Sequence, residues 1–277
     1  MKVVLTIAGS DSSGGAGIQA DLKTFEAFGV FGCSAITVLT AQNTTGVQAI
    51  HPLPVAFIRA QIESVLSDFD VAAIKIGMLY NREIIEAVAS IIKPLTMPVV
   101  LDPVCVAKSG SPLLREDAID ALRSFCRVVT LSTPNLHEAY RLFGYTGEMG
   151  DMSDMGDMSE ETGLLQCLID HPAPVLMKHH VAGAMCADLL YFQGQKRVYP
   201  SELLDSASQH GTGCSYSSAI AANLALGLEL DEAIVRSKRF ITEAIRHAPA
   251  IGHGVHPINH KAGGLHAAER LVGDREE

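Results

Sequence analysis

The chain has 277 residues, of which 48% are hydrophobic and 19% charged, and its formal net charge at pH 7 is −10. This acidic balance argues against nucleic acid or an anionic membrane as a partner, and no apolar run reaches the roughly 20 residues that a membrane-spanning helix needs. The hydrophobic share is enough for a large core, and no linker rich in Pro, Gly and Ser divides the sequence. We therefore expect one domain over residues 1–264 and a charged tail over 265–277.

The first half of the chain alternates between short apolar runs and segments with helical spacing. We expect strands over 3–8, 33–39, 71–76, 97–102 and 128–131, and helices over 18–28, 54–66, 82–92 and 116–125. Strands that are apolar along their length and separated by helices predict a mostly parallel sheet with helices on both faces. We expect the crossover connections to be right-handed.

The second half begins with a helix that follows Asn135 and ends near Phe143. An acidic segment rich in Gly, Asp and Met, residues 147–158, then interrupts the alternation; it has no apolar face, so we expect a surface loop rather than a metal site. A strand over 175–178 and a hairpin around residues 193–196 follow, and the last helices are expected over 214–226 and 231–247. The charged end after Gly264 should fray.

The cysteines and the N-terminus indicate the compartment. None of the six cysteines forms a C-x-x-C pair, and the chain opens directly on a strand-like run without the layout of a signal peptide. We therefore expect a reduced, cytoplasmic protein.

The sequence HGTGCS at His210 to Ser215 precedes a run of small and apolar residues with helical spacing. Gly211 and Gly213 permit a turn whose amides, with that of Thr212 and the helix N-terminus behind them, would hold a phosphate. Cys214 would lie in the first helical turn, where the helix field favours the thiolate, which makes it a candidate base or nucleophile. An ordinary turn before a buried helix, with Cys214 as a small core residue, remains the alternative.

Ligands of open parallel sheets bind at the carboxyl ends of the strands, so the residues after each strand are the next candidates. Gly15 to Ala20 match the G-x-G-x-x-A form of a dinucleotide site, but the second strand ends in Thr-Ala-Gln-Asn, without the acidic residue such a site needs. The glycine-rich loop can instead bring amides and Asp21 to a compact polar ligand, and Gln42 offers one donor and one acceptor to a heteroaromatic edge. A helix-surface charge and a solvent-facing loop residue are the alternatives for Asp21 and Gln42.

Six motifs, in order along the chain, resemble the hydroxymethylpyrimidine/phosphomethylpyrimidine kinases of thiamine biosynthesis, a family of the ribokinase-like superfamily. They are residues 14–21, 40–44, 75–79, 107–110, 133–135 with Glu138, and 210–214, and the resemblance extends from about residue 5 to residue 260. It implies a three-layer α/β/α fold with a mostly parallel central sheet, a homodimer, and ATP-dependent phosphorylation of 4-amino-5-hydroxymethyl-2-methylpyrimidine and then of its monophosphate.

The resemblance also implies roles for single residues. Gln42 would bind the pyrimidine edge, with Asp21 and the loop at Gly9 around the substrate. Cys214 stands where most ribokinase-like enzymes have an aspartate, so it would be the base that takes the proton of the substrate hydroxyl. Phosphoryl transfer needs charge stabilisation more than covalent help, which the amides of Gly211 to Cys214 would supply.

For the nucleotide and its metal, the resemblance implies that Asp102 and Glu138 hold Mg²⁺ through water. Asn135 and Lys178 would lie near the ATP phosphates, with Thr212 in the phosphate-binding turn. The alternative is that the two carboxylates are structural, with Asp102 at a strand end and Glu138 on a helix surface. Their positions after strands favour a functional role.

Several residues depart from the family pattern. Lys178 is followed by His-His-Val instead of Gly-Gly-His, and Cys105 stands where methionine is common. The histidines 253, 256, 260 and 266 are expected to be scattered on the surface rather than to form a zinc site, because no cysteine or carboxylate set accompanies them. The small residues around Lys108, Ser109 and Gly110 suggest a lid.

Two other functions remain open from the sequence. Some pyridoxal kinases of the same superfamily share the Gly-Thr-Gly-Cys ending and a second loop cysteine, a part that Cys105 would play. A non-catalytic protein that binds pyrimidines is a rival of a different class. The presence of Cys214, Asp102 and Glu138 together argues against it.

Overall fold

The structure, a computed structural model, describes residues 1–107, 109–144, 158–182, 185–204 and 210–265. Its strands are β1 (Val3–Asp11), β2 (Phe31–Asn43), β3 (Gly46–Pro52), β4 (Val71–Ile76), β5 (Val99–Leu101), β6 (Leu131–Ser132), β7 (Val175–Ala182), β8 (Met185–Phe192) and β9 (Gln195–Ser201). Its helices are α1 (Gly17–Ala27), α2 (Val55–Leu66), α3 (Arg82–Ile92), the 3₁₀ helix η1 (Glu116–Ala118), α4 (Ile119–Cys126), α5 (Leu136–Phe143), α6 (Met158–Ile169), α7 (Thr212–Ala225) and α8 (Leu230–Arg246).

One nine-stranded sheet runs through the described residues, in the order β3-β2-β1-β4-β5-β6-β7-β8-β9. From β2 to β7 every neighbouring pair is parallel, whereas β3, β8 and β9 are antiparallel additions at the two edges. The expectation of a mostly parallel sheet is confirmed. Because the parallel strands point the same way, their carboxyl ends share one edge of the sheet.

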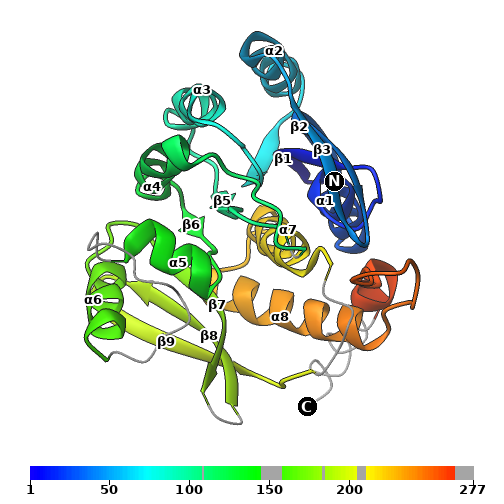
Figure 1. The fold of residues 1–277 in the computed structure, drawn as a ribbon. Coiled ribbons are helices and arrows are strands. Elements are labelled where there is room, and N and C mark those ends of the chain that lie inside the picture. The colour runs from blue at the N-terminus through cyan, green and yellow to red at the C-terminus, as the bar shows by residue number, and fades with distance from the viewer. Residues whose placement is uncertain (108, 145–157, 183–184, 205–209, 266–277) are drawn as a thin grey trace.

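Helices cover both faces of this sheet and form two separate cores (Figure 1). Helices α2 to α6 pack on one face through residues such as Ile58, Ile84 and Phe125, and α1, α7 and α8 pack on the other through residues such as Phe25 and Phe240. The strands between them are buried on both sides, which explains their unbroken apolar sequences. The fold has the three layers that the family resemblance implied.

Helix α7 is the central helix of its layer. Its run of Ala219, Ile220, Ala221 and Ala222 is completely buried, because the helix packs against β4 and β5 as well as α1 and α8. Small side chains let the backbones approach closely on several sides at once. This packing brings the first turn of α7 to the carboxyl ends of β4 and β5.

The structure contains two elements that the sequence patterns did not predict. Strand β2 continues past Leu39 to Asn43 and turns back through β3, which pairs with it as an antiparallel hairpin. Helix α6 begins at Met158, the last residue of the segment expected as a loop, and residues 147–157 lie outside the described residues. Most of the large apolar residues of α6 fall in its second half, among them the buried Leu164 and Leu168, so its periodicity is weak.

One strand lies at a shifted position. A strand was expected over 128–131, but β6 comprises only Leu131–Ser132, and Val128 is 49% exposed. Val128 therefore lies in the connection between α4 and β6 and not in the sheet. No helix in the described ranges is both long and apolar enough to cross a membrane.

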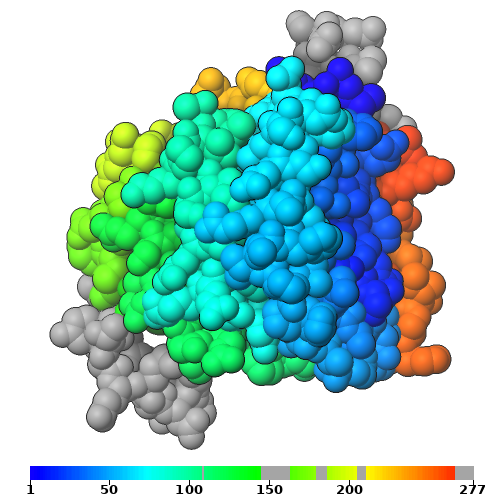
Figure 2. Space-filling view, turned by 90° about the horizontal axis from the view of Figure 1, so that it is seen from above, coloured from blue at the N-terminus to red at the C-terminus, as the bar shows by residue number. Residues whose placement is uncertain are grey.

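The segment after α8 returns to the N-terminal half of the chain. The backbone of Val255 donates to the carbonyl of Thr44 at the β2–β3 turn, with an N···O distance of 2.9 Å. In the space-filling view, the orange and red C-terminal segments accordingly lie beside the blue N-terminal ones (Figure 2). Of the expected tail, all but residue 265 lies outside the described residues.

Candidate active site

The first turn of α7 meets the end of β5 and the middle of β7. A Cβ atom added at Gly213 would lie 3.3 Å from Lys178 Nζ and 3.6 Å from Asp102 Oδ2. Lys178 belongs to β7 and Asp102 directly follows β5, so three segments far apart in sequence converge on one point. The convergence joins a helix N-terminus, which carries partial positive charge, to an ammonium and a carboxylate.

Lys178 and Asp102 form a nearly buried ion pair. The Lys178 Nζ donates to Asp102 Oδ1 at 2.6 Å, and the side chains are 11% and 3% exposed. Burial lowers the pKa of Lys178, but the charges of Asp102 and Glu138 outweigh it and raise the pKa overall. The lysine is therefore a fixed cation beside the amides of α7, a combination that suits a phosphate group.

Glu138 and Asn135 form the N-terminal cap of α5. The backbone N–H of Asn135 donates to Glu138 Oε2 at 2.9 Å, and the N–H of Glu138 donates to Asn135 Oδ1 at the same distance. The Cys105 N–H donates to Glu138 Oε1 at 3.3 Å. Burial raises the pKa of Glu138, Lys178 lowers it, and Asp102 raises it further, with a net rise. Residue 138 was expected as a metal carboxylate, and the structure gives both of its oxygens a structural donor as well.

The described residues contain no group of three or more His, Cys, Asp or Glu side chains that could together hold a metal ion. Asp102 nevertheless lies close enough to Glu138 for its charge to raise the pKa of the Glu138 carboxyl. Carboxylate oxygens are the donors that Mg²⁺ prefers, and the ion keeps several waters when proteins bind it, so this pair of carboxylates fits Mg²⁺.

Cys214 lies in the first turn of α7, half-buried, and its sulfur accepts a hydrogen bond from the backbone N–H of Gly17. Burial raises the pKa of the Cys214 thiol to about 11; Lys75 lowers it, Asp102 and Asp21 raise it, and the Gly17 N–H lowers it. The expectation that the thiolate is favoured at this position is therefore wrong. The helix field and Lys75 do not compensate for the loss of solvation and two nearby carboxylates.

This assignment predicts slow alkylation of Cys214 at neutral pH. Cys167 is exposed, so the measurement uses a Cys167→Ser background, and Cys214→Ser in that background gives the residual rate of the other cysteines. We expect the rate with iodoacetamide to keep rising above about pH 8.5, the pKa of a free thiol, because thiolate formation is displaced towards pH 11. A plateau of the alkylation rate below about pH 8.5 would show that the helix terminus lowers the thiol pKa by more than burial raises it.

Asp21 lies behind the site rather than in it. Both its side chain and that of Lys75 are completely buried, and Lys75 Nζ lies 2.9 Å from each Asp21 oxygen. Thr6 Oγ1 and Ser218 Oγ also donate to the carboxylate, at 2.6 and 2.7 Å. The direct substrate contact that the resemblance implied for Asp21 does not agree with this placement. Its carboxylate instead fastens β1, β4 and α7 together beneath Cys214.

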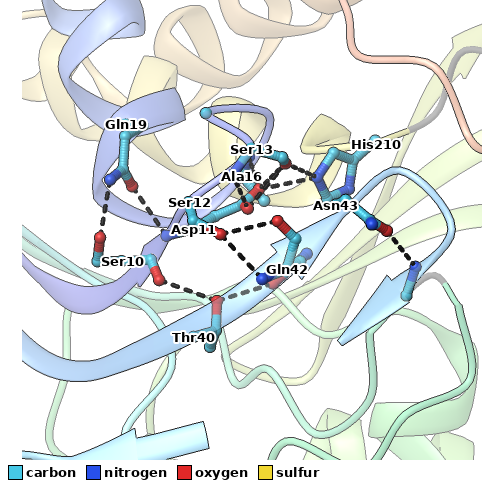
Figure 3. A network of polar contacts seen from close by, with 12 residues as sticks. Ser10, Asp11, Ser12, Ser13, Ala16, Gln19, Thr40, Gln42, Asn43 and His210 are labelled. Atoms are coloured by element: carbon cyan, nitrogen blue, oxygen red, sulfur yellow. Dashed lines mark hydrogen bonds and ion pairs between the residues drawn. The ribbon is translucent and has the colours of Figure 1, made fainter. Parts of the chain in front are cut away.

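The loop after β1 is organised by Asp11, a residue that the sequence patterns did not single out (Figure 3). The backbone N–H groups of Ser13 and Ala16 each donate to its carboxylate at 2.8 Å, and His210 Nε2 lies 2.8 Å from Oδ2. Burial raises the pKa of Asp11, but the hydrogen bonds from His210, Ser13 and Ala16 lower it to about 2. A polar residue at the carboxyl end of a strand is the signal that could have identified it.

Gln42 and Gly9 lie at the same edge of the sheet. Thr40 Oγ1 donates to Gln42 Oε1 at 3.1 Å, and the backbone of Gln42 exchanges two hydrogen bonds with the Ser12 hydroxyl, at 2.9 and 2.7 Å (Figure 3). Gly9 is buried within β1, where the register with β2 shifts. Gln42 is therefore held in place beside the glycine-rich loop, as a residue that contacts a ligand must be, and its substrate contact stays a prediction.

Cys105, the candidate for a second loop cysteine, is buried. It is 1% exposed, its Sγ donates to the Pro103 carbonyl at 3.3 Å, and burial together with the charge of Glu138 raises its pKa to about 12. The nearby turn is closed by a 2.8 Å bond from Ala107 N to Ser111 O, and Lys108 lies outside the described residues. The lid stays a prediction.

The histidines near the C-terminus do not share one environment. His253 is exposed, but His260 is only 7% exposed and its Nε2 lies 2.8 Å from Ser215 Oγ. The expectation of surface histidines is therefore wrong for His260, whose pKa burial lowers to about 4. His266 and the side chains of His179 and His180 lie outside the described residues.

Comparison with known proteins gives the family. The model of a family described as phosphomethylpyrimidine kinase matches residues 11–259. The hydroxymethylpyrimidine/phosphomethylpyrimidine kinase of Haemophilus influenzae is 44% identical over 267 residues, which cover 95% of this chain and 97% of the relative.

Two solved structures show how the fold is shared. The phosphomethylpyrimidine kinase of Clostridium difficile is 40% identical with a TM-score of 0.71, over 88% of this chain and 100% of that one. The ADP complex of Bacillus subtilis pyridoxal kinase is 36% identical with a TM-score of 0.79, over 96% of this chain and 99% of that one. The chain thus has the ribokinase-like fold, and it belongs to the phosphomethylpyrimidine kinase family.

Proposed function

We propose that this protein transfers the γ-phosphoryl group of ATP to 4-amino-5-hydroxymethyl-2-methylpyrimidine and then to the resulting monophosphate, in the biosynthesis of thiamine diphosphate. The convergence of Lys178, Asp102 and the first turn of α7 on one point carries this proposal. Phosphoryl transfer spreads negative charge over the oxygens of the group in transit, so its main demand is fixed positive charge. Kinase relatives with similar chains over their whole length support the substrate class.

The amides of Gly211 and Gly213 and the ammonium of Lys178 bind the phosphates of the nucleotide in this proposal. Thr212, the first residue of α7, lies between the two glycines, and Asn135 contributes its amide NH₂ because its oxygen caps α5. Mg²⁺ would be held by Asp102 and, through water, by Glu138, and when bound it neutralises charge on the phosphates. Lys178 stays in contact with Asp102 Oδ1, which leaves Oδ2 on the side of Gly213.

Cys214 is the proton acceptor for the substrate hydroxyl. With a thiol pKa of about 11, roughly one molecule in 10⁴ carries the thiolate at pH 7, so turnover through this group should increase with pH. The buried Asp21–Lys75 pair lies beneath it and, with Gly17, keeps its position fixed.

Gln42 gives a prediction for substrate binding. Gln42→Leu keeps the size of the side chain but removes its hydrogen bonds, so affinity for the pyrimidine should fall by about 1–3 kcal/mol while ATP affinity stays nearly unchanged. Isothermal titration with each ligand measures both. Gln48→Leu, on the same hairpin, is the matched control, because Gln48 is exposed and its Nε2 donates to Asn43 and Gly46 within the hairpin. Equal pyrimidine affinities for wild type and Gln42→Leu would remove Gln42 from the site.

A pyridoxal kinase is the second candidate, favoured by the similarity of the fold to that of the Bacillus subtilis enzyme. The buried Cys105 argues against it, because the loop cysteine on which this alternative relied lies in the core. Turnover assays with ATP and either the hydroxymethylpyrimidine or pyridoxal, resolving mono- from diphosphate, distinguish the two. Formation of the pyrimidine diphosphate supports the first proposal, and turnover of pyridoxal alone would overturn it.

We also propose a homodimer located in the cytoplasm. The family resemblance supports the dimer, and the absence of a C-x-x-C pair among six cysteines supports a reducing compartment. The small-molecule pyrimidine, its phosphate and ATP are the ligands that this proposal requires.

A further inference from the structure

His210 and Asp11 join two glycine-containing loops that come from opposite ends of the sequence. The His210 Nε2 lies 2.8 Å from Asp11 Oδ2, and the two side chains are 8% and 3% exposed. Ser13 Oγ lies 2.8 Å from Asp11 Oδ1 and 3.4 Å from His210 Nε2, which closes the contact on a third side (Figure 3). Since the pKa of Asp11 is about 2, the carboxylate is ionised and Nε2 carries a proton towards it.

The backbones of the two loops touch where this pair holds them. A Cβ atom added at Gly15 would lie 2.2 Å from His210 Cδ2, so the imidazole packs directly on the Gly15 backbone. Gly211 has φ +81°, and a Cβ atom there would lie 1.8 Å from the Gly15 carbonyl oxygen. Neither position has room for a side chain. The turn that presents the α7 amides is therefore supported by the loop after β1.

The same loop reaches the catalytic cysteine at its far end. Ala16 N donates to the Asp11 carboxylate at 2.8 Å, and the next residue, Gly17, donates its N–H to the Cys214 sulfur. Asp11 thus fixes the peptide just before the one that contacts Cys214, while His210 fixes the turn from which Cys214 projects. The contact depends on the position of both loops, so displacement of either should loosen it.

His210 is anchored from its other side by the segment after α8. Its backbone N–H donates to the His256 carbonyl at 3.1 Å, and the neighbouring His253 and Gly254 N–H groups donate to Thr44 Oγ1 at 3.1 and 3.2 Å. Thr44 follows Gln42 by two residues. Through its backbone, His210 accordingly joins the phosphate-binding turn to the C-terminal segment that contacts Thr44.

We propose that His210 is a positioning residue: paired with Asp11, it holds the loop after β1 against the first turn of α7, so that the amides and Cys214 are in place before the phosphoryl group arrives. It contacts no reacting atom in this proposal, which rests on the proposed kinase function. Preorganised donors stabilise a transition state without rearranging at the moment of reaction, whereas loosened ones lose part of that effect. The loss should appear in kcat and leave the KM for the pyrimidine nearly unchanged.

The test compares wild type with His210→Ala, His210→Gln and Asp11→Asn. We expect kcat to fall about 10–100-fold in His210→Ala and Asp11→Asn, with KM for the pyrimidine within about threefold of wild type. Gln places an N–H donor near the position of Nε2, so His210→Gln should recover most of kcat. The double variant His210→Ala with Asp11→Asn should have a kcat no lower than that of the slower single variant, since both substitutions break the same His210–Asp11 contact. The matched control is His253→Ala, whose exposed side chain lies on the same segment.

A second measurement does not depend on turnover. In the Cys167→Ser background, His210→Ala and Asp11→Asn should each increase the alkylation rate of Cys214 at least fivefold, because the Gly17 contact that covers the sulfur is loosened. If wild type fails to phosphorylate the pyrimidine, the kinase proposal falls, and the alkylation rates still decide the positioning role. The positioning role would be overturned by a wild-type kcat in both His210→Ala and Asp11→Asn. It would also be overturned by a kcat loss in the double variant equal to the product of the two single losses, or by an unchanged alkylation rate of Cys214. Should His210→Ala not fold, Asp11→Asn alone gives the expected loss of kcat and the faster alkylation of Cys214.

Discussion

Turnover by a Cys214→Ser variant is expected to fall by on the order of 10²–10⁴-fold, the usual contribution of a positioned general base, with little change in the affinities for ATP and pyrimidine. Serine keeps the backbone donors of the first turn of α7 and nearly the size of the side chain, but its hydroxyl stays protonated. The thiol has a pKa of about 11, so the reactive thiolate is a minor species and wild-type kcat should rise with pH from about pH 7 to pH 10.

The pH profile separates a base from a structural cysteine. Cys214→Asp introduces a carboxylate that is ionised at neutral pH, so it should recover part of the rate and make kcat nearly independent of pH above about pH 6. Steady-state kinetics over that range, with thermal unfolding of each variant, gives both answers. Wild-type turnover by Cys214→Ser would show that the cysteine is structural and that the amides, with Lys178, carry catalysis alone.

The Lys178→Met variant should lose about 10²–10³-fold in kcat/KM for ATP-dependent turnover, because it removes the fixed cation from the phosphate-binding point. It also leaves the Asp102 carboxylate buried, 3% exposed, without its partner at 2.6 Å. Stability should therefore fall as well, by roughly 3–5 kcal/mol, as is usual when one partner of a buried ion pair is removed. Chemical denaturation and kinetics on the same preparation measure the two effects.

A double variant separates those effects. Lys178→Met with Asp102→Asn removes the unpaired charge, so it should recover stability relative to Lys178→Met while turnover stays low. Lys178→Arg keeps the positive charge but changes its shape, and should lie between wild type and Lys178→Met in kcat. Recovery of turnover in the double variant would mean that Lys178 serves only to neutralise Asp102.

The elements that the sequence determined are those with strong local signals. Helix α3 has the expected bounds, 82–92, because Asn81 caps it with a 2.9 Å bond from Ile84 N and its isoleucines recur on one face. Strand β4 likewise has the expected bounds, 71–76. Strand β3 was missed because its side chains are half exposed at an edge of the sheet, where pairing with β2 rather than burial makes it a strand.

The sequence by itself also determined the family, since motifs spread over the chain are each a local pattern that needs no structure to be seen. Only the tertiary structure decided the state of the site. Burial and two carboxylates, not the helix terminus, set the pKa of Cys214 at about 11. Asp21, which was expected to contact the substrate, forms a buried ion pair with Lys75. Asp11 contacts His210, which lies 199 positions away in the sequence. Solvation and charge depend on which groups lie within a few ångströms of each other, and folding sets those distances between residues that the sequence keeps far apart.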